Sequence, residues 1–279
     1  MINGYLMVII AMLIWGSIGI FVREINLPSE VIVFFRVFIA GISMIFINGR
    51  KLLNERKNIT KKEYGLLIVG GVFLALNWLF FFKSLKITTI SSATLSYYTA
   101  PVLATFIAVF VLKEDLNKRS IIAIVFSFLG IIIMISEPST LSSNTTAIGI
   151  LYGIIAAVFY GMVTISGKLL NNVSSLNIVL IQTLVASLIF SPFLKEVQTI
   201  QTKDILLLLV VGLVHTSLAL TIYFEGIKKI RVQSIGVLSY IDPLNAIVFG
   251  FIYFYEIPQI STIIGGLMIL ISTYIVMKR

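Results

Sequence analysis

The sequence predicts an all-α integral membrane protein whose ten transmembrane helices form two inverted five-helix repeats around a central cavity. An apolar composition, ten long apolar runs and a residue match between the two halves of the chain predict this fold. Of the 279 residues, 58% are hydrophobic and 12% are charged, whereas a soluble domain carries about 25% charged residues. A water-soluble fold would leave too much apolar surface exposed, so the composition favours a bilayer.

A helix that spans the bilayer needs about 17 to 25 mainly apolar residues, and ten runs meet this requirement. The first run starts without a basic residue at Met1-Ile2-Asn3 and continues beyond Trp15. We therefore expect a retained helix and not a cleaved signal peptide. The predicted spans are residues 4–22, 30–47, 63–82, 89–111, 118–135, 147–167, 175–192, 204–224, 232–252 and 259–277.

The distribution of Lys and Arg predicts the orientation of these spans, because basic loops stay on the cytoplasmic side. With the N-terminus inside, 15 of the 21 Lys and Arg residues fall in inner segments, 5 fall in outer loops, and Arg36 falls within the second span. We therefore expect a multi-pass protein of the plasma (inner) membrane with both termini in the cytoplasm.

The two halves of the chain match one another, on either side of a Ser- and Thr-rich outer linker at residues 136–146. Residues 1–135 and 147–279 hold five predicted spans each, and an odd number of spans gives the second half the opposite orientation. Inverted repeats place a binding site near the midplane between the halves and let either side open, which predicts a transporter. At offsets of 145 and later 142, the matched residues include Trp15 with Tyr160, Arg23 with Lys168, Phe82 with Phe224, Tyr98 with Tyr240, Pro101 with Pro243 and Glu114 with Glu256.

Paired motifs in the fourth and ninth spans add a family resemblance. The fourth span contains Leu95-Ser96-Tyr97-Tyr98-Thr99-Ala100-Pro101, and the ninth contains Leu238-Ser239-Tyr240-Ile241-Asp242-Pro243. With ten spans in two inverted halves, the whole chain resembles the EamA-type transporters of the drug/metabolite transporter (DMT) superfamily. The resemblance implies a cavity lined chiefly by spans 1, 3, 4, 6, 8 and 9, and export of amino acids or similar small metabolites by alternating access.

Two titratable residues are the candidates for proton coupling. Asp242 lies about ten residues into the ninth predicted span, about 15 Å deep at 1.5 Å per residue. A carboxylate at that depth costs a few kcal/mol, so it should face a wet cavity, a partner or a proton. His215 lies at similar depth in the eighth span, and its imidazole titrates in the physiological range. An equally open interpretation is that both residues only pack and hydrogen-bond, with Asp242 fixing a helix break.

Aromatic and amide side chains at mid-depth are the remaining candidates for the substrate cavity. Stacking and cation–π contacts suit such residues to substrate binding, although ordinary helix packing also accounts for them. Pro101 and Pro243 occupy matched positions and are the candidate helix breaks or hinges. The full set of cavity candidates is Trp15, Asn77, Trp78, Tyr97, Tyr98, Tyr160, His215, Tyr240, Asp242 and Asn245.

Arg36 is the one basic residue well inside a predicted span. We expect it to have a structural or topological role at the periphery of the cavity, either reaching outward along the helix or pairing with Glu30.

Several classes of function are excluded or disfavoured by the sequence. The chain has no cysteine and one histidine, which excludes disulfides, thiolate catalysis and two-His metal motifs. It has no GxxxxGK[ST] motif, so we expect no ATP hydrolysis, no cofactor, no metal and no enzymatic activity. Its net charge of +9 is spread between apolar runs and does not favour nucleic acid. We expect a small-molecule substrate, the bilayer and protons as partners; an exchanger of phosphorylated or nucleotide sugars and a non-transporting membrane scaffold stay open as alternatives.

Overall fold

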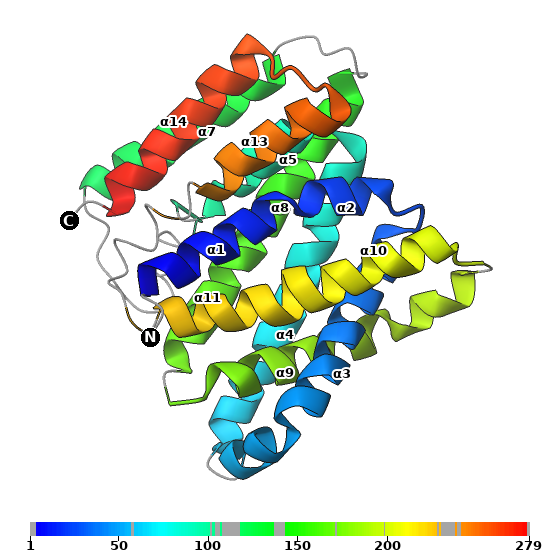
Figure 1. The fold of residues 1–279 in the computed structure, drawn as a ribbon. Coiled ribbons are helices and arrows are strands. Elements are labelled where there is room, and N and C mark those ends of the chain that lie inside the picture. Colours follow the sequence, from blue (N-terminus) through cyan, green and yellow to red (C-terminus); the bar gives the residue numbers. More distant parts are fainter. Residues whose placement is uncertain are drawn as a thin grey trace.

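The described part of the chain is built from helices. The computed structural model describes residues 4–56, 59–100, 102–103, 107, 118–136, 143–170, 172–197, 199–227, 229, 238 and 241–277, and none of these residues lies in a strand. Figure 1 shows the helices as one bundle in which the start of α1 and the end of α14 lie on the same side. The predicted all-α class is confirmed for these residues.

The first half of the bundle begins with a span that is interrupted at Ser17. The hydroxyl of Ser17 donates to the carbonyl of Ile14 at 2.7 Å, at the joint between the two helical segments. The N-terminus of α4 is fixed by a capping box in which Thr60 and Glu63 satisfy each other's backbone N–H groups. The helices of this half are α1 (Gly4–Gly16), α2 (Ile18–Glu24), α3 (Ser29–Arg56), α4 (Lys61–Ile87), α5 (Ile90–Tyr97) and α7 (Lys118–Ser136).

The second half contains a π-helical segment within one of its long spans. This segment, η2 (Leu213–Leu218), lies between α10 (Thr202–Gly212) and α11 (Ala219–Ile227), and such bulges are frequent at functional sites. The other helices are α8 (Ser143–Leu169), α9 (Ser175–Phe190), the 3-10 turn η1 (Ser191–Glu196), α13 (Ile241–Phe254) and α14 (Ile260–Met277).

Within the described residues, six helical segments are long and apolar enough to cross a membrane, and each coincides with a predicted span. The 19-residue α7 covers the predicted span 118–135, whereas α13 and the apolar part of α14 are shorter than a full span. Residues 101, 104–106 and 108–111 of the predicted fourth span lie outside the described residues, so ten spans stay a prediction. The six segments are Gly4–Glu24, Ser29–Arg50, Lys61–Ile87, Thr145–Gly167, Ser175–Lys195 and Thr202–Gly226.

The helices pack in pairs that join the two halves. The most extensive contacts are those of α4 with α8, α7 with α14, α3 with α9, α4 with α9 and α1 with α11, and Figure 1 shows α7 beside α14. The helices α4 and α8 are antiparallel: Ser84 donates to the carbonyl of Gly149 at 2.7 Å, and a β-carbon on Gly70 would lie 3.0 Å from the Ser166 hydroxyl. Small residues at these two contacts permit α4 and α8 to approach each other closely.

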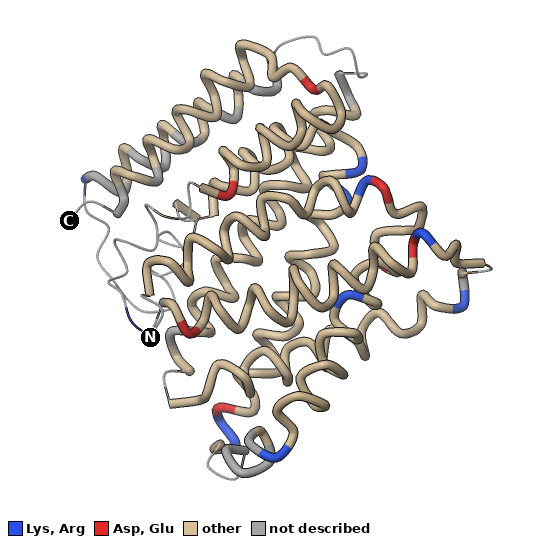
Figure 2. Tube along the Cα trace, viewed as in Figure 1, with Lys and Arg blue, Asp and Glu red and all other residues tan. Residues whose placement is uncertain are grey.

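Charged residues gather at the ends of the helices. Figure 2 shows tan through most helix interiors and blue or red mainly near the ends. This distribution keeps most charges near water and leaves apolar middles for lipid and for the core. Charged residues that lie deep in the bundle are therefore the first places to look for function.

Candidate functional site

A cavity of about 380 Å³ lies between the two halves of the bundle. Its lining comes from α1, α2, α3, α4, α5, α8, α9, α11 and α13, and it extends to the turn between α8 and α9, where Leu170, Val173 and Ser175 line it. The walls are mainly apolar and aromatic, with a small number of polar groups, as in small-molecule sites. Seven of the predicted cavity residues line it: Trp15, Asn77, Trp78, Tyr97, Tyr98, Tyr160 and Asp242.

A chain of aromatic rings runs along the cavity wall. The Trp15 indole lies 5.0 Å from the Tyr223 ring, centroid to centroid. The Tyr160 and Tyr223 hydroxyls form a hydrogen bond with one another, and the Tyr160 ring lies 5.5 Å from that of Tyr97. Tyr97 in turn stacks on Phe81 at 4.6 Å. The wall therefore offers extended π faces to an apolar or cationic group.

Two hydrogen-bonded pairs supply polar groups at the cavity. The Asn77 amide donates to the Tyr97 hydroxyl at 3.1 Å and to the carbonyl of Ala156 at 2.8 Å, which fixes the amide between α4 and α8. The Tyr98 hydroxyl donates to the Asp242 carboxylate. Asp242 lies in the first turn of α13, where the helix dipole favours a negative charge.

His215 and Asn245 do not line the cavity, contrary to the prediction. The His215 ring lies in η2 beside Phe21 at 4.8 Å, with Nε2 3.0 Å from the Ser17 hydroxyl, so it packs at the joint between α1 and α2. Its contacts among the described residues do not include Asp242. The Asn245 amide donates to the carbonyl of Leu13 at 2.9 Å, because this face of α13 packs on α1.

Of the three remaining predicted residues, the structure describes one. Tyr240 and Pro101 lie outside the described residues. Pro243 is buried in the first turn of α13, where its missing N–H breaks no intrahelical hydrogen bond.

Arg36 corrects the prediction of a peripheral residue, because its side chain lines the cavity. It does not pair with Glu30, which instead forms an ion pair with Lys83 at 2.6 Å. The Arg36 guanidinium carbon lies 3.9 Å from the centre of the Trp78 ring, and Nε donates to Thr216 at 2.9 Å. The sequence reveals a buried position for Arg36, but helix rotation decides which way the side chain points.

Phe81 and Tyr223 also line the cavity and were not in the predicted set. Phe81 lies three residues after the candidate Trp78, which places both on one helix face, and an offset of 142 relates Phe81 to Tyr223. These two spacings are the sequence signals that could have identified them.

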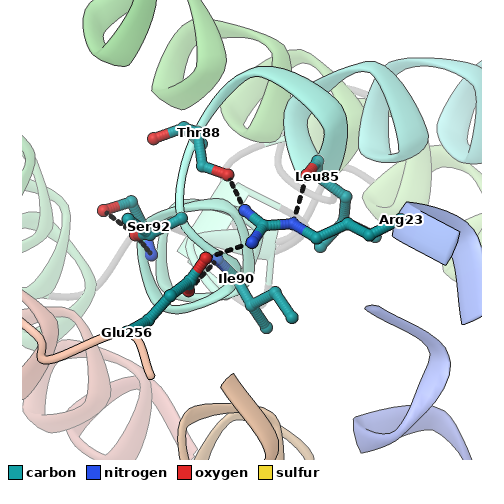
Figure 3. Close-up of polar contacts among 7 residues, drawn as sticks. Arg23, Leu85, Thr88, Ile90, Ser92 and Glu256 are labelled. Atoms are coloured by element: carbon teal, nitrogen blue, oxygen red, sulfur yellow. Dashed lines mark hydrogen bonds and ion pairs between the residues drawn. The ribbon is translucent and has the colours of Figure 1, made fainter. Parts of the chain in front are cut away.

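A cluster of polar contacts closes the other end of the bundle (Figure 3). Arg23, near the end of α2, donates through Nε to the carbonyl of Leu85 at 2.9 Å and also contacts the Thr88 carbonyl and the Glu256 carboxylate. The second oxygen of Glu256 accepts from the Ile90 N–H at 2.9 Å. Arg23 belongs to the first half and Glu256 to the second, so the ion pair ties the halves together.

The polar cluster and the α8–α9 turn lie at opposite ends of the molecule. Thr88, in the cluster, lies beside Gly149 near the start of α8, whereas the cavity reaches Gly167 and Leu170 at the end of the same helix. The ion pair between Glu24 and Lys203, at 2.5 Å, adds to the closed end. The cavity therefore extends toward the end of the bundle that lies opposite the polar cluster.

A family model for the EamA-like transporter family matches this chain twice, over residues 2–136 and 147–278. The chain belongs to this family. The uncharacterized transporter YxxF of Bacillus subtilis is 28% identical over 274 residues, which is 97% of this chain and 88% of YxxF. The uncharacterized inner membrane transporter YicL of Salmonella typhimurium is 24% identical, over 98% of this chain and 95% of YicL. The chain is thus a multi-pass integral membrane protein of a transporter family.

Two further similarities bear on cargo and on fold. The S-adenosylmethionine uptake transporter of Rickettsia prowazekii is 24% identical to the EamA-family chain, over 89% of this chain and 82% of that transporter. A solved crystal structure, 17% identical, matches with a TM-score of 0.66 over 98% of this chain and 95% of its own. This structural likeness supports the fold alone.

Proposed function

We propose that this EamA-family chain is a secondary transporter that exports amino acids or similar small metabolites by alternating access, with proton coupling through Asp242. The observation that carries the proposal is a cavity between the halves with Asp242 in its wall and an ion pair across the halves at one end. In this mechanism the cavity takes up substrate from the cytoplasm and the Arg23 cluster is the closed outer gate.

The cavity lining supports a pair of related halves. The contacts between helices follow the predicted repeat. When each helix is replaced by its counterpart in the other half, the contact of α4 with α8 becomes that of α11 with α1, and the contact of α4 with α9 becomes that of α10 with α3. Lining residues also recur at the repeat offsets of 145 and 142. The recurring pairs are Trp15 with Tyr160, Ile18 with Val163, Trp78 with Leu220, Phe81 with Tyr223 and Ala100 with Asp242. A cavity on the axis between inverted repeats is where transporters bind their cargo.

The position of the Asp242 carboxylate supports exchange of a proton for the substrate. Such an exchange would drive the substrate out of the cell. Asp242 is the one acidic residue among the described residues that line the cavity. A carboxylate in such a place binds either a proton or the ammonium group of a substrate, because holding both would leave excess positive charge in a medium of low dielectric. Mutually exclusive binding makes the transporter an exchanger, and inward proton flow then drives substrate outward.

A proteoliposome assay tests this function directly. Wild-type protein and Asp242→Asn are reconstituted, and substrate-triggered proton movement is recorded for a panel of amino acids, amines and small organic acids. We expect a saturable signal with the wild type and none with Asp242→Asn, which still exchanges substrate for substrate. Silence of the folded wild type in both proton and exchange assays would contradict transport of these compounds and favour a scaffold.

The lining disfavours an exchanger of phosphorylated or nucleotide sugars. Phosphate recognition usually gathers several cationic or N–H donors around one group. Arg36 is the one Lys or Arg among the described lining residues, and Asp242 lines the same cavity. Arg36 would attract a dianionic phosphate and Asp242 would repel it, so the net electrostatic contribution to binding would be small.

A further inference from the structure

Arg36 is buried at the cavity wall, and Nη1 of its guanidinium group donates no hydrogen bond to a described residue. Its side chain is 1% exposed and is held from two sides, by the face of Trp78 and by the Thr216 hydroxyl in η2. Thr216 is itself fixed, since its hydroxyl donates to the carbonyl of Val211 at 2.8 Å. These contacts orient the plane of the guanidinium group before any ligand binds.

At Nη1, the guanidinium group lacks a hydrogen-bond partner within the described part of the chain. Nη1 is buried and has no hydrogen-bond acceptor among the described residues, and none of the ion pairs between them includes Arg36. A buried arginine with an unsatisfied donor and no counter-ion is costly, and aromatic faces offset only part of that cost. An anionic group that reached this edge would supply both a hydrogen-bond acceptor and a counter-charge.

We propose that Arg36 is an anion subsite of the cavity and binds the carboxylate of the transported molecule. Guanidinium is suited to this role because its fixed fork of donors matches a carboxylate. This assignment rests on the proposed transport function and narrows the cargo, since simple amines lack the group that Arg36 recognises.

Asp242 provides the opposite charge in the same cavity. Both charged side chains line it. A substrate that carries a carboxylate and an ammonium group would pair the first with Arg36 and the second with Asp242, with its apolar part against the aromatic wall.

Tryptophan fluorescence reports directly on this subsite. The chain contains two tryptophans, Trp15 and Trp78, and both line the cavity. Because Nη1 is shielded from water in this conformation, a carboxylate must displace the Trp78 indole or the guanidinium group to bind. Either movement changes the emission excited at 295 nm.

The test compares acids with their uncharged derivatives on purified protein. The probes are L-leucine, L-methionine and L-phenylalanine, each titrated beside its α-amide, which keeps the ammonium group and loses the carboxylate. We expect at least one acid to bind the wild type at least tenfold more tightly than its amide. In Arg36→Gln this preference falls to less than twofold, whereas Arg36→Lys retains part of it.

Thermal unfolding of each variant separates a lost subsite from a lost fold. If Arg36→Gln does not fold, Thr216→Val takes its place, because it removes the acceptor of Nε while keeping the shape of the side chain. A purely structural Arg36 would leave the acid-to-amide ratio unchanged in every folded variant. That result, or equal binding of acids and amides to the wild type, overturns the assignment.

Flux in proteoliposomes distinguishes this assignment from the proposed function. Transport of amides or amines as fast as the acids would uphold transport and overturn the anion subsite. Tight, Arg36-dependent binding of an acid without any flux would uphold the subsite and overturn transport. Neither binding nor flux of any acid by folded protein would overturn both.

Discussion

Asp242 lies deep in the bundle, in the first turn of α13, and its carboxylate accepts a hydrogen bond from Tyr98. The helix terminus and the donor favour the charged carboxylate, while the surrounding apolar wall favours the protonated one. The two opposing influences suit a group that changes its protonation state during each transport cycle.

Asp242→Asn keeps the size of the side chain and removes its charge. We expect substrate exchange to persist at lower affinity, because asparagine lacks the charge that pairs with an ammonium group. The dependence of net transport on pH should disappear, because asparagine carries no titratable proton. Glu63→Gln is the matched control: Glu63 lies in the capping box of α4 and is not among the residues that line the cavity, and glutamine preserves such a box. Wild-type pH dependence in Asp242→Asn would contradict proton coupling at this residue.

At the scale of elements, glycine permits the close crossing of α1 and α13. A β-carbon on Gly16 would lie 2.8 Å from the Asn245 side chain and 2.9 Å from the backbone oxygen of Asp242. The crossing therefore places the first turn of α13, with Asp242, against the joint between α1 and α2. This explains why Asn245 is a packing residue although it lies three residues from a cavity residue.

Gly16→Ala tests this crossing against a glycine in open space. We expect the free energy of unfolding to fall by about 1–3 kcal/mol, since overpacking forces a backbone shift. Gly65→Ala in α4, where no atom lies within 4 Å of the added carbon, is the control and should leave stability unchanged or slightly raised. The measurement is thermal unfolding in detergent, and equal melting temperatures for both variants would contradict the crossing.

At the scale of the whole molecule, the polar contacts at the Arg23 end oppose opening of the two halves. The Arg23–Glu256 side chains are 18% and 14% exposed, whereas those of Lys203 and Glu24 are 59% and 43% exposed. A shielded pair is screened less by water and salt than an exposed one. The first pair should therefore dominate the closed state.

Arg23→Gln should shift the molecule toward the outward-open state. The chain has no cysteine, so a single Ile18→Cys in the cavity lining gives a clean labelling site. We expect a membrane-impermeant maleimide added outside to label this cysteine several-fold faster in the Arg23→Gln background. Lys203→Gln is the matched control and should change the rate little. Unchanged labelling in Arg23→Gln would contradict the outer gate.

The orientation of the chain is tested with two further single cysteines. Lys62 and Thr202 are exposed, and the positive-inside distribution places them on opposite sides of the membrane. We expect the impermeant maleimide to label Thr202→Cys in intact cells and Lys62→Cys only after the membrane is opened. The reverse pattern would show that the N-terminus lies outside and that the closed gate faces the cytoplasm.

The sequence alone predicted the class of the protein, because length and apolarity of a run are enough to identify a membrane helix. It also predicted the family and most of the aromatic lining, since Trp15 and Tyr160 are matched by the repeat and lie at mid-depth. These features depend on composition and spacing along the chain. The family match and the six spans among the described residues support the class and the family, whereas the aromatic lining is seen only in the folded cavity.

Tertiary structure decided which polar side chains share a space. His215, Asn245 and Arg36 are all polar residues within apolar runs, and no pattern around them distinguishes the one that lines the cavity from the two that pack elsewhere. Packing of α1 against α13 and η2 turns His215 and Asn245 away from the cavity, while the rotation of α3 brings Arg36 to Trp78. Helix rotation follows from contacts between distant segments, and a pattern within one segment does not contain that information.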